Sequence, residues 1–155
     1  MMKRLLLVAC LSAFASVASA QVPSVMGVWL VEKKTAQVRI APCPSPANGP
    51  ICGTIVHILD LRGPNGQVTT EDAANDWRNV DPKLRDRKVL GLVMLYNFKK
   101  TSDPNSFEDG YIYNGDNGKT YNANVSLQPD GTLKVRGYVG SPMFGESQIW
   151  TRVGQ

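Results

Sequence analysis

Residues 118–140 read GKTYNANVSLQPDGTLKVRGYVG, and this stretch contains the strongest fold signal in the chain. Apolar and polar side chains alternate along both arms, which flank the turn signal Pro-Asp-Gly at 129–131. Proline presets φ at the first corner of such a turn, and glycine accepts the positive φ that other residues resist. Alternation with a period of two around a turn predicts an antiparallel hairpin with one wet face and one buried face.

Six further segments of the chain have the composition of β-strands. They are residues 27–31, 36–41, 52–59, 89–98, 107–113 and 146–153. Together with the hairpin they give eight strands in a small domain, joined mostly by short turns. This pattern favours an all-β fold, a closed or nearly closed antiparallel barrel, although a sandwich would also satisfy it.

One region does not have a strand pattern. Thr70 is placed to N-cap a short helix over residues 71–77, and Asp81-Pro82 is placed to begin another helical turn. The next strand, residues 89–98 (VLGLVMLYNF), is apolar on both faces, so something must cover its outer side. We expect the short helices to cap it.

The first and last strands supply a reason to prefer a closed barrel. Trp29 lies on the first strand, and Arg152 follows Trp150 on the last. In an up-and-down barrel these strands are neighbours, so Arg152 is expected to stack on Trp29 as a cation–π pair at one end. The alternative is an ordinary core tryptophan with an exposed arginine.

Residues 1–20 have the parts of a secretory signal peptide. Lys3 and Arg4 precede an uncharged apolar stretch, and Ala18-Ser19-Ala20 gives a small-x-small pattern for cleavage after Ala20. The apolar stretch is too short for a transmembrane helix. We therefore expect a periplasmic or secreted protein, not an integral membrane protein, with a single domain over residues 21–155.

Two consequences follow from that cleavage. The formal net charge of +4 falls to +2 because Lys3 and Arg4 leave with the peptide, so the basic composition is weak support for a nucleic-acid partner and none is expected. A competing interpretation puts a lipid anchor on Cys10, since residues 7–10 (LVAC) resemble a lipobox. Cleavage there would leave an apolar region of only about five residues, which argues against it.

The two remaining cysteines, Cys43 and Cys52, flank the Pro/Gly-rich loop PSPANGPI. In an exported chain such a pair predicts one disulfide. The alternative of a metal or redox pair is poorly supported, because the spacing is not CxxC and no histidine lies between the two.

The order of short motifs resembles a bacterial exported family known as domain of unknown function 2147. The motifs are G-x-W, V-R-I-x-x-C, C-G-x-I-V, D-x-x-N-x-D-P-x-L-R-x-R, G-x-I-Y, G-K-T-Y, D-G-T-L-K-V-R-G-Y-V-G and W-T-R. The resemblance implies a lipocalin-like barrel in the bacterial envelope, with no agreed activity. The chain departs from the family at Asn114-Gly115, where Asp-Pro is usual, and at Phe107, where tryptophan is common.

Motifs for catalysis are missing from the sequence. His57 is the single histidine and lies on a strand, where a surface or satisfied core role is the commoner one. We find no nucleophile elbow, P-loop or dinucleotide-binding glycine pattern, and a zinc site would lack ligands once both cysteines are oxidised. We therefore expect no enzyme, no cofactor and no metal.

Binding is the favoured class. Residues 76–87 are rich in charge beside the most apolar strand, and either cap the barrel end through salt bridges or form a polar rim in which Arg85 or Arg87 grips a carboxylate or phosphate. Tyrosines on neighbouring strands suit an amphipathic ligand, or they simply pack. The candidate ligand-binding residues are Asp76, Asn79, Arg85, Arg87, Tyr96, Tyr113, Tyr121 and Arg136.

An interaction or structural role in the envelope is the alternative. Residues 141–145 place Met143 and Phe144 in a turn, either as an exposed docking site for an envelope protein or as a plug folded into the barrel. The favoured function is non-enzymatic binding of a small apolar or amphipathic molecule. That function requires a void of a few hundred Å³ inside the barrel.

Overall fold

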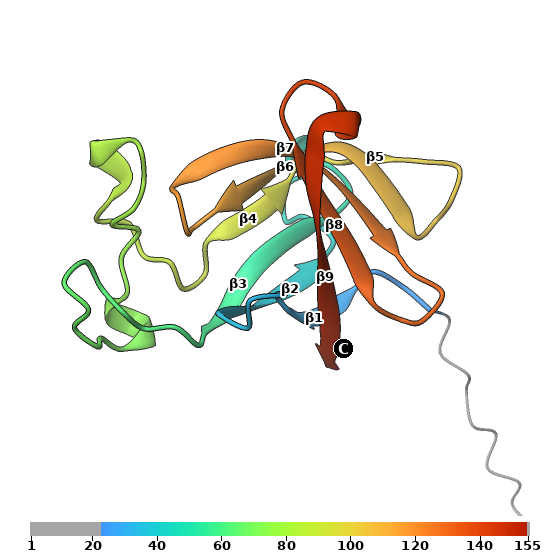
Figure 1. The fold of residues 1–155 in the computed structure, drawn as a ribbon. Helices are drawn as coiled ribbons and strands as arrows, with labels where there is room; N and C mark the ends of the chain where they lie inside the picture. The colour runs from blue at the N-terminus through green and yellow to red at the C-terminus, as the bar shows by residue number, and fades with distance from the viewer. Residues whose placement is uncertain (1–22, 155) are drawn as a thin grey trace, which may run out of the picture.

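The computed structural model describes residues 23–154, which form a closed antiparallel barrel (Figure 1). The predicted signal peptide and Cys10 lie outside the described residues. Eight strands close the barrel: β1 Gly27–Leu30, β2 Ala36–Ala41, β3 Cys52–Ile58, β4 Val93–Tyr96, β6 Ser106–Asn114, β7 Lys119–Leu127, β8 Leu133–Tyr138 and β9 Gly145–Gly154. A two-residue strand, β5 Lys99–Lys100, pairs with the start of β6.

Each strand pairs with its neighbours in sequence, which makes this an up-and-down barrel. Closure occurs at two places: β4 pairs with β6 through Leu95 and Ile112, and β1 pairs with β9 through Trp29 and Arg152. The predicted all-β barrel is confirmed, and the sandwich is excluded because no edge separates two sheets.

The helices are shorter than the sequence predicts. Four single 3-10 turns occur in the described chain: η1 Pro46–Asn48, η2 Glu71–Ala73, η3 Pro82–Leu84 and η4 Pro142–Phe144. The expected helix over residues 71–77 stops at Ala73, because the backbone N–H of Asp76 bonds sideways to the carbonyl of Arg87. Thr70 makes no side-chain cap, whereas Asp81 accepts a hydrogen bond from the Lys83 N–H.

The predicted strand over residues 89–98 is also shortened, to β4. Val89 donates its N–H to the Ala74 carbonyl, and Gly91 takes a positive φ of 82° that turns the chain before the strand begins. The first half of this apolar run is therefore the end of the long β3–β4 connection, residues 59–92, and its side chains pack against the core instead of extending the sheet.

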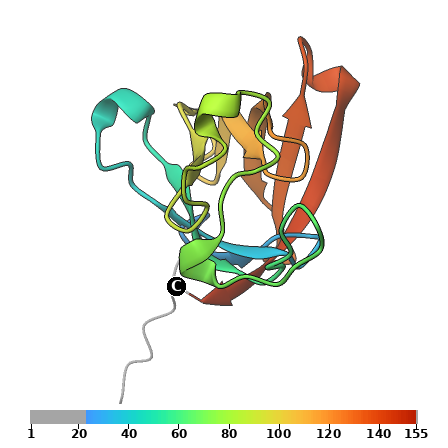
Figure 2. The same cartoon turned by 90° about the vertical axis from the view of Figure 1, so that its left-hand side faces the viewer.

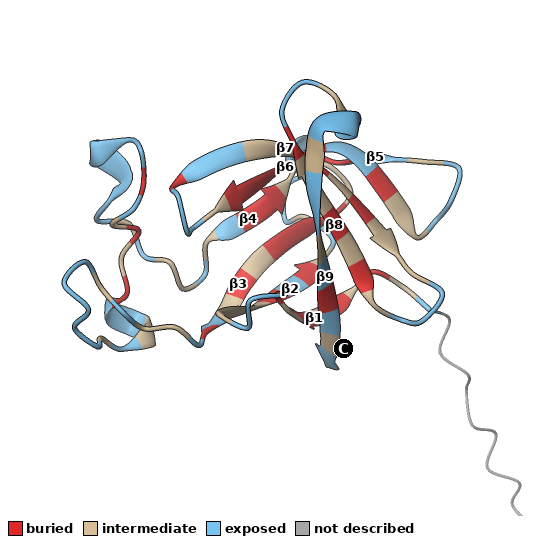
Figure 3. Cartoon of the chain, viewed as in Figure 1, coloured by how far each residue is buried: buried red, intermediate tan, exposed pale blue. Residues whose placement is uncertain are grey.

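One end of the barrel is filled by side chains. Trp29, Trp150 and Leu133 are fully buried there, among the residues coloured red in Figure 3. Phe98 is also buried and its ring lies against Gly110, where a Cβ added to the glycine would come within 2.4 Å of it. This end, which also carries the β2–β3, β4–β6 and β7–β8 connections, is the closed end.

The other end is the open end, where four connections meet. They are residues 31–35, 59–92, 114–118 and 139–144. Figure 2 looks toward this end and shows the green β3–β4 connection running across it. The connection is held there partly by a hydrogen bond from the Val80 N–H to the Gly118 carbonyl.

The closed end is stabilised by a disulfide and by the contacts of Arg152. The disulfide between Cys43 and Cys52 is present, with an S–S distance of 2.07 Å, so the prediction of a structural bridge is confirmed. The Arg152 guanidinium lies 4.1 Å from the centroid of the Trp29 ring and donates to the carbonyls of Met26 and Ser24. The strand pairing that brings these two residues together is the one the sequence predicts.

Candidate functional site: a cavity at the open end of the barrel

The open half of the barrel contains a cavity of about 750 Å³. Its deep walls are inward-facing side chains of the strands. These are Ile55, Met94, Ile112, Val135 and Trp150. Gly137 leaves space among them, since the nearest atom to a Cβ placed on it is 3.6 Å away. The volume lies within the range of small-molecule sites.

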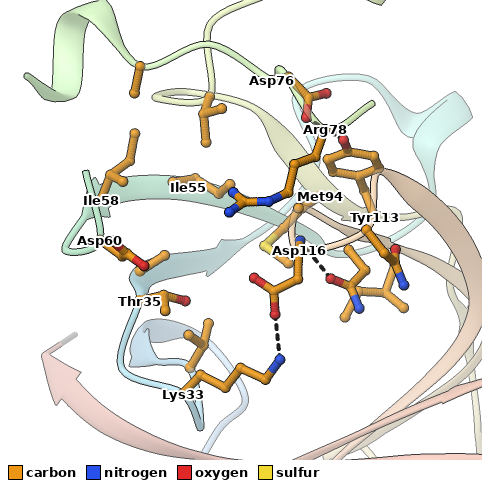
Figure 4. A pocket seen from close by; sticks show the side chains of 18 of the residues that line it. Lys33, Thr35, Ile55, Ile58, Asp60, Asp76, Arg78, Met94, Tyr113 and Asp116 are labelled. Atoms are coloured by element: carbon orange, nitrogen blue, oxygen red, sulfur yellow. Dashed lines mark hydrogen bonds and ion pairs between the residues drawn. The ribbon is translucent and has the colours of Figure 1, made fainter. Parts of the chain in front are cut away.

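Charged side chains surround the entrance of this cavity (Figure 4). Lys33 of the β1–β2 turn and Asp116 of the β6–β7 turn form an ion pair of 2.6 Å across it. The hydrogen bond from Lys33 to Asp116 raises the pKa of the lysine above its ordinary value. Asp60 is held by Arg62 at 2.7 Å, and this hydrogen bond lowers the pKa of the Asp60 carboxyl. The site is thus apolar in its depth and charged at its entrance.

A buried polar cluster fixes the β3–β4 connection beside the cavity. The Asp76 side chain is only 2% exposed and accepts hydrogen bonds from Arg87 Nε at 2.8 Å, Asn79 Nδ2 at 2.7 Å and the Tyr113 hydroxyl. Arg87 also lies over the Tyr113 ring, 4.7 Å from its centroid. Burial, followed by the hydrogen bond to Asp76, raises the pKa of Tyr113 to about 12.

This cluster contains four of the residues predicted from sequence, but their side chains bond to one another and so hold the β3–β4 connection in place. Arg87 is occupied by Asp76, and Arg85 donates through Nε to the Asn79 carbonyl at 2.9 Å. The sequence suggests that Arg85 or Arg87 binds an anionic ligand. In the structure, Arg87 and the Nε of Arg85 instead donate to acceptors of the protein itself. Tyr121 does line the cavity, and its hydroxyl accepts a hydrogen bond from Asn117.

Four of the eight candidates, Asn79, Arg87, Tyr96 and Arg136, are not among the residues that line the cavity, and the last two lie on its outer side. The pairing of β4 with β6 is the reason: Leu95 lies opposite the inward-facing Ile112, and Tyr96 lies opposite the outward-facing Tyr111, on which it packs with the ring centroids 5.6 Å apart. Arg136 faces outward on β8 and donates to the Pro142 carbonyl at 2.6 Å and to Ser147 Oγ at 3.0 Å. It supports the β8–β9 turn.

Three residues at the entrance are not among the candidates chosen from sequence: Lys33, Arg78 and Asp116. They come from connections far apart in sequence, and no motif links them. Counting strands in an up-and-down barrel places all three connections at the same end, and this signal was available in the sequence.

The β8–β9 turn is not a plug. Met143 is 80% exposed and Phe144 is 79% exposed, so both side chains project from the open end, with Phe144 bordering the cavity. His57 is exposed as well, and its Nδ1 lies 3.4 Å from Glu71 Oε1. Within residues 23–154 no three histidine, cysteine or carboxylate side chains are grouped closely enough to hold a metal ion. None of the helices in that range has the length and apolarity to cross a membrane.

Comparison with known proteins identifies the family. Residues 27–152 match the bacterial family described as "Uncharacterized protein conserved in bacteria (DUF2147)". The chain belongs to this family. No curated protein matches the sequence significantly. Among solved structures, the chain is similar to protein HP1028 from the human pathogen Helicobacter pylori, which is described as belonging to the lipocalin family.

The similarity to that structure has a TM-score of 0.65 at 23% sequence identity, and covers 85% of this chain and 84% of the other. It shows a lipocalin-like fold, as the motif resemblance implies. At this level of identity the comparison concerns the fold alone, so the function must be argued from the cavity.

Proposed function

We propose that this protein is a periplasmic or secreted, non-enzymatic binding protein that holds a small apolar or amphipathic molecule in the cavity. The observation that carries the proposal is the cavity itself, about 750 Å³ of space with apolar depth inside a barrel that is filled at its other end. A barrel of eight strands has an interior just large enough either to be filled by side chains or to hold one ligand. Here one half is filled and the other is hollow.

The arrangement of the walls supports an amphipathic guest. Val135 and Trp150 are at most 1% exposed and form the bottom, whereas Lys33 and Asp116 at the entrance are more than half exposed. A molecule with an apolar body would replace water from the depth and keep its polar end near the entrance. The disulfide supports the proposed export, because such bridges persist in oxidising compartments.

The proposal is tested with an uncharged fluorescent probe, N-phenyl-1-naphthylamine, and a graded series at Gly137. We expect saturable binding at one probe per protein, a small loss with Gly137→Ala and at least a tenfold loss with Gly137→Leu, which places a branched side chain against Ile112 in the cavity wall. Thr151→Leu places a leucine side chain on the exposed face of β9, outside the cavity, and this variant should bind the probe like the wild type.

Near-ultraviolet circular dichroism checks that the variants keep the native packing. Native mass spectrometry of purified protein, and of its organic extract, then identifies any molecule carried from the cell. Absence of saturable binding in a folded wild-type protein, or equal binding in folded Gly137→Leu, would refute the cavity as a binding site.

The second candidate function, docking on an envelope protein, is favoured by the exposure of Met143 and Phe144. A Met143→Ser variant, changed at an exposed side chain that does not line the cavity, should then lose a crosslinked partner in the native envelope while keeping full probe binding. If this variant keeps the partner, or if no partner is crosslinked to the wild type, this candidate fails.

A further inference from the structure

Arg78 has an unusual place in the cavity. It extends from the β3–β4 connection into the cavity with its guanidinium directed toward Ile55 and Met94 (Figure 4). One face of the guanidinium is stacked on the Trp77 ring at 3.8 Å. With any partner in the described residues 23–154, the Arg78 side chain forms neither an ion pair nor a hydrogen bond as donor.

The other cationic groups at the cavity are occupied differently. Lys33 and Arg62 each pair with a carboxylate, at 2.6 Å to Asp116 and 2.7 Å to Asp60. These pairs partly neutralise the carboxylates of Asp116 and Asp60, and after the hydrogen bond from Arg62, Arg78 also contributes to the lowered pKa of Asp60. Asp86 and Glu146 also line the cavity, so the overall charge of the entrance does not select an anion, and a preference for one would have to come from a single cationic group.

Arginine is well suited to this task. Its planar guanidinium presents N–H donors in a fork that matches a carboxylate or phosphate, and stacking on an aromatic ring leaves those in-plane donors available. The contact with Trp77 holds the side chain in one orientation, which lowers the entropy lost on binding. Below the guanidinium, the cavity wall is Ile55, Met94 and Ile112, which offers only apolar surface to a tail.

We propose that Arg78 binds the anionic head group, a carboxylate or phosphate, of a single-chain amphiphile whose tail lies in the deep apolar half of the cavity. This inference rests on the proposed function, and it adds the chemical class of the ligand and the residue that recognises it.

The test compares ligands that share one tail. Dodecanoate, dodecyl phosphate and dodecanol are titrated against the wild type and Arg78→Gln by displacement of N-phenyl-1-naphthylamine. We expect the wild type to bind at least one of the two anions about tenfold or more tightly than the alcohol, as a charge-assisted hydrogen bond provides. Arg78→Gln should remove that difference and leave the affinity for dodecanol unchanged, whereas Arg78→Lys should retain part of it.

The control is Arg39→Gln, which removes the same charge from an exposed position on β2 outside the cavity. It should keep the preference for the anion, because a general loss of positive charge is not the cause. Equal affinity of the wild type for all three ligands, or an unchanged preference in Arg78→Gln, overturns the role of Arg78 while the binding function stands. Failure of every ligand and of the probe itself would instead refute the binding function. The anion that binds more tightly identifies the head group.

Discussion

At the scale of single residues, close packing and burial make two positions sensitive. Gly110 is one, because the buried Phe98 ring occupies the space that a side chain would need. Tyr113 is the other, because its hydroxyl is buried against Asp76. Both positions lie on β6: Gly110 faces the filled half and Tyr113 lies beneath the β3–β4 connection.

Gly110→Ala should destabilise the fold by about 1–3 kcal/mol, the usual cost of overpacking a core. The added Cβ would approach Phe98 Cδ1 to 2.4 Å, and the Phe98 ring, 2% exposed, has little room to move. Gly137→Ala is the matched control and should change the free energy of unfolding by less than about 0.5 kcal/mol. Urea denaturation of the three proteins checks this, and equal midpoints would contradict it.

Part of the stability that Tyr113 contributes should be lost at high pH. Its folded pKa of about 12 exceeds the ordinary value of 10.0, so the unfolded chain releases the phenol proton first. The stabilisation is complete below pH 10 and is lost as pH rises toward 12, by no more than about 2 kcal/mol. The difference in unfolding free energy between wild type and Tyr113→Phe should therefore be constant from pH 7 to 9 and shrink above pH 10. A difference that grows above pH 10 would show the opposite sign of shift.

At the scale of elements, the β3–β4 connection is held in place by polar contacts more than by helices. Its η2 and η3 turns have three residues each, and neither contains a buried residue. Asp76 is buried and joins the connection to β6 through Tyr113, while Val80 bonds to the β6–β7 turn. Since Arg78 lies two residues after Asp76, this cluster also determines where Arg78 enters the cavity.

Asp76→Ala should therefore loosen the connection, at a cost of about 3–5 kcal/mol, because Arg87, Asn79 and Tyr113 would all lose their shared acceptor. Amide hydrogen exchange should accelerate in residues 74–90 more than in β1 and β9. Asp60→Ala, which breaks an exposed pair, should cost less than about 1 kcal/mol and leave exchange in residues 74–90 unchanged. Uniform acceleration across the barrel would indicate that Asp76 supports the whole fold and not this connection.

At the scale of the whole molecule, the barrel is divided into a filled end and a hollow end. The seam between β1 and β9 belongs to the filled end, and Arg152 covers it by stacking on Trp29 and donating to two carbonyls of the preceding N-terminal residues. Closure at this seam removes the exposed edges that an open sheet would present. The open half of the barrel can contain a cavity because the closed half supplies the packed core.

Arg152→Leu should destabilise the barrel by about 2–4 kcal/mol, since it removes a cation–π contact and hydrogen bonds from a charged donor. Arg39→Leu, on the exposed face of β2, should change the stability by less than about 0.5 kcal/mol. Thermal and urea unfolding check both values. Probe binding in native conditions should survive in Arg152→Leu, because the cavity lies at the other end; a selective loss of binding would contradict this division of the barrel.

The sequence by itself determined the order of the eight barrel strands, the hairpin turn at 129–131, the disulfide and the neighbourhood of Trp29 and Arg152, although not the bounds of β4. These features depend on local alternation, on turn residues and on the sequential order of an up-and-down barrel, so they are written in short segments. The polar character of segment 76–87 is evident from sequence for the same reason. The outward position of Tyr96 was not accessible from sequence, because Met94 and Leu95 are both buried where the pairing of β4 with β3 is irregular.

The tertiary structure alone decided which side chains meet at the cavity and which cations remain available there. Lys33 and Asp116 are 83 residues apart, and Asp76 takes Arg87 rather than Arg78 because of how the β3–β4 connection folds back on itself. Whether a barrel of this size is hollow depends on the summed volume of all inward-facing side chains. Gly137 leaves space at the open end, whereas the Phe98 ring fills space at the closed end. Such a sum is a property of packing in three dimensions, and no local pattern carries it.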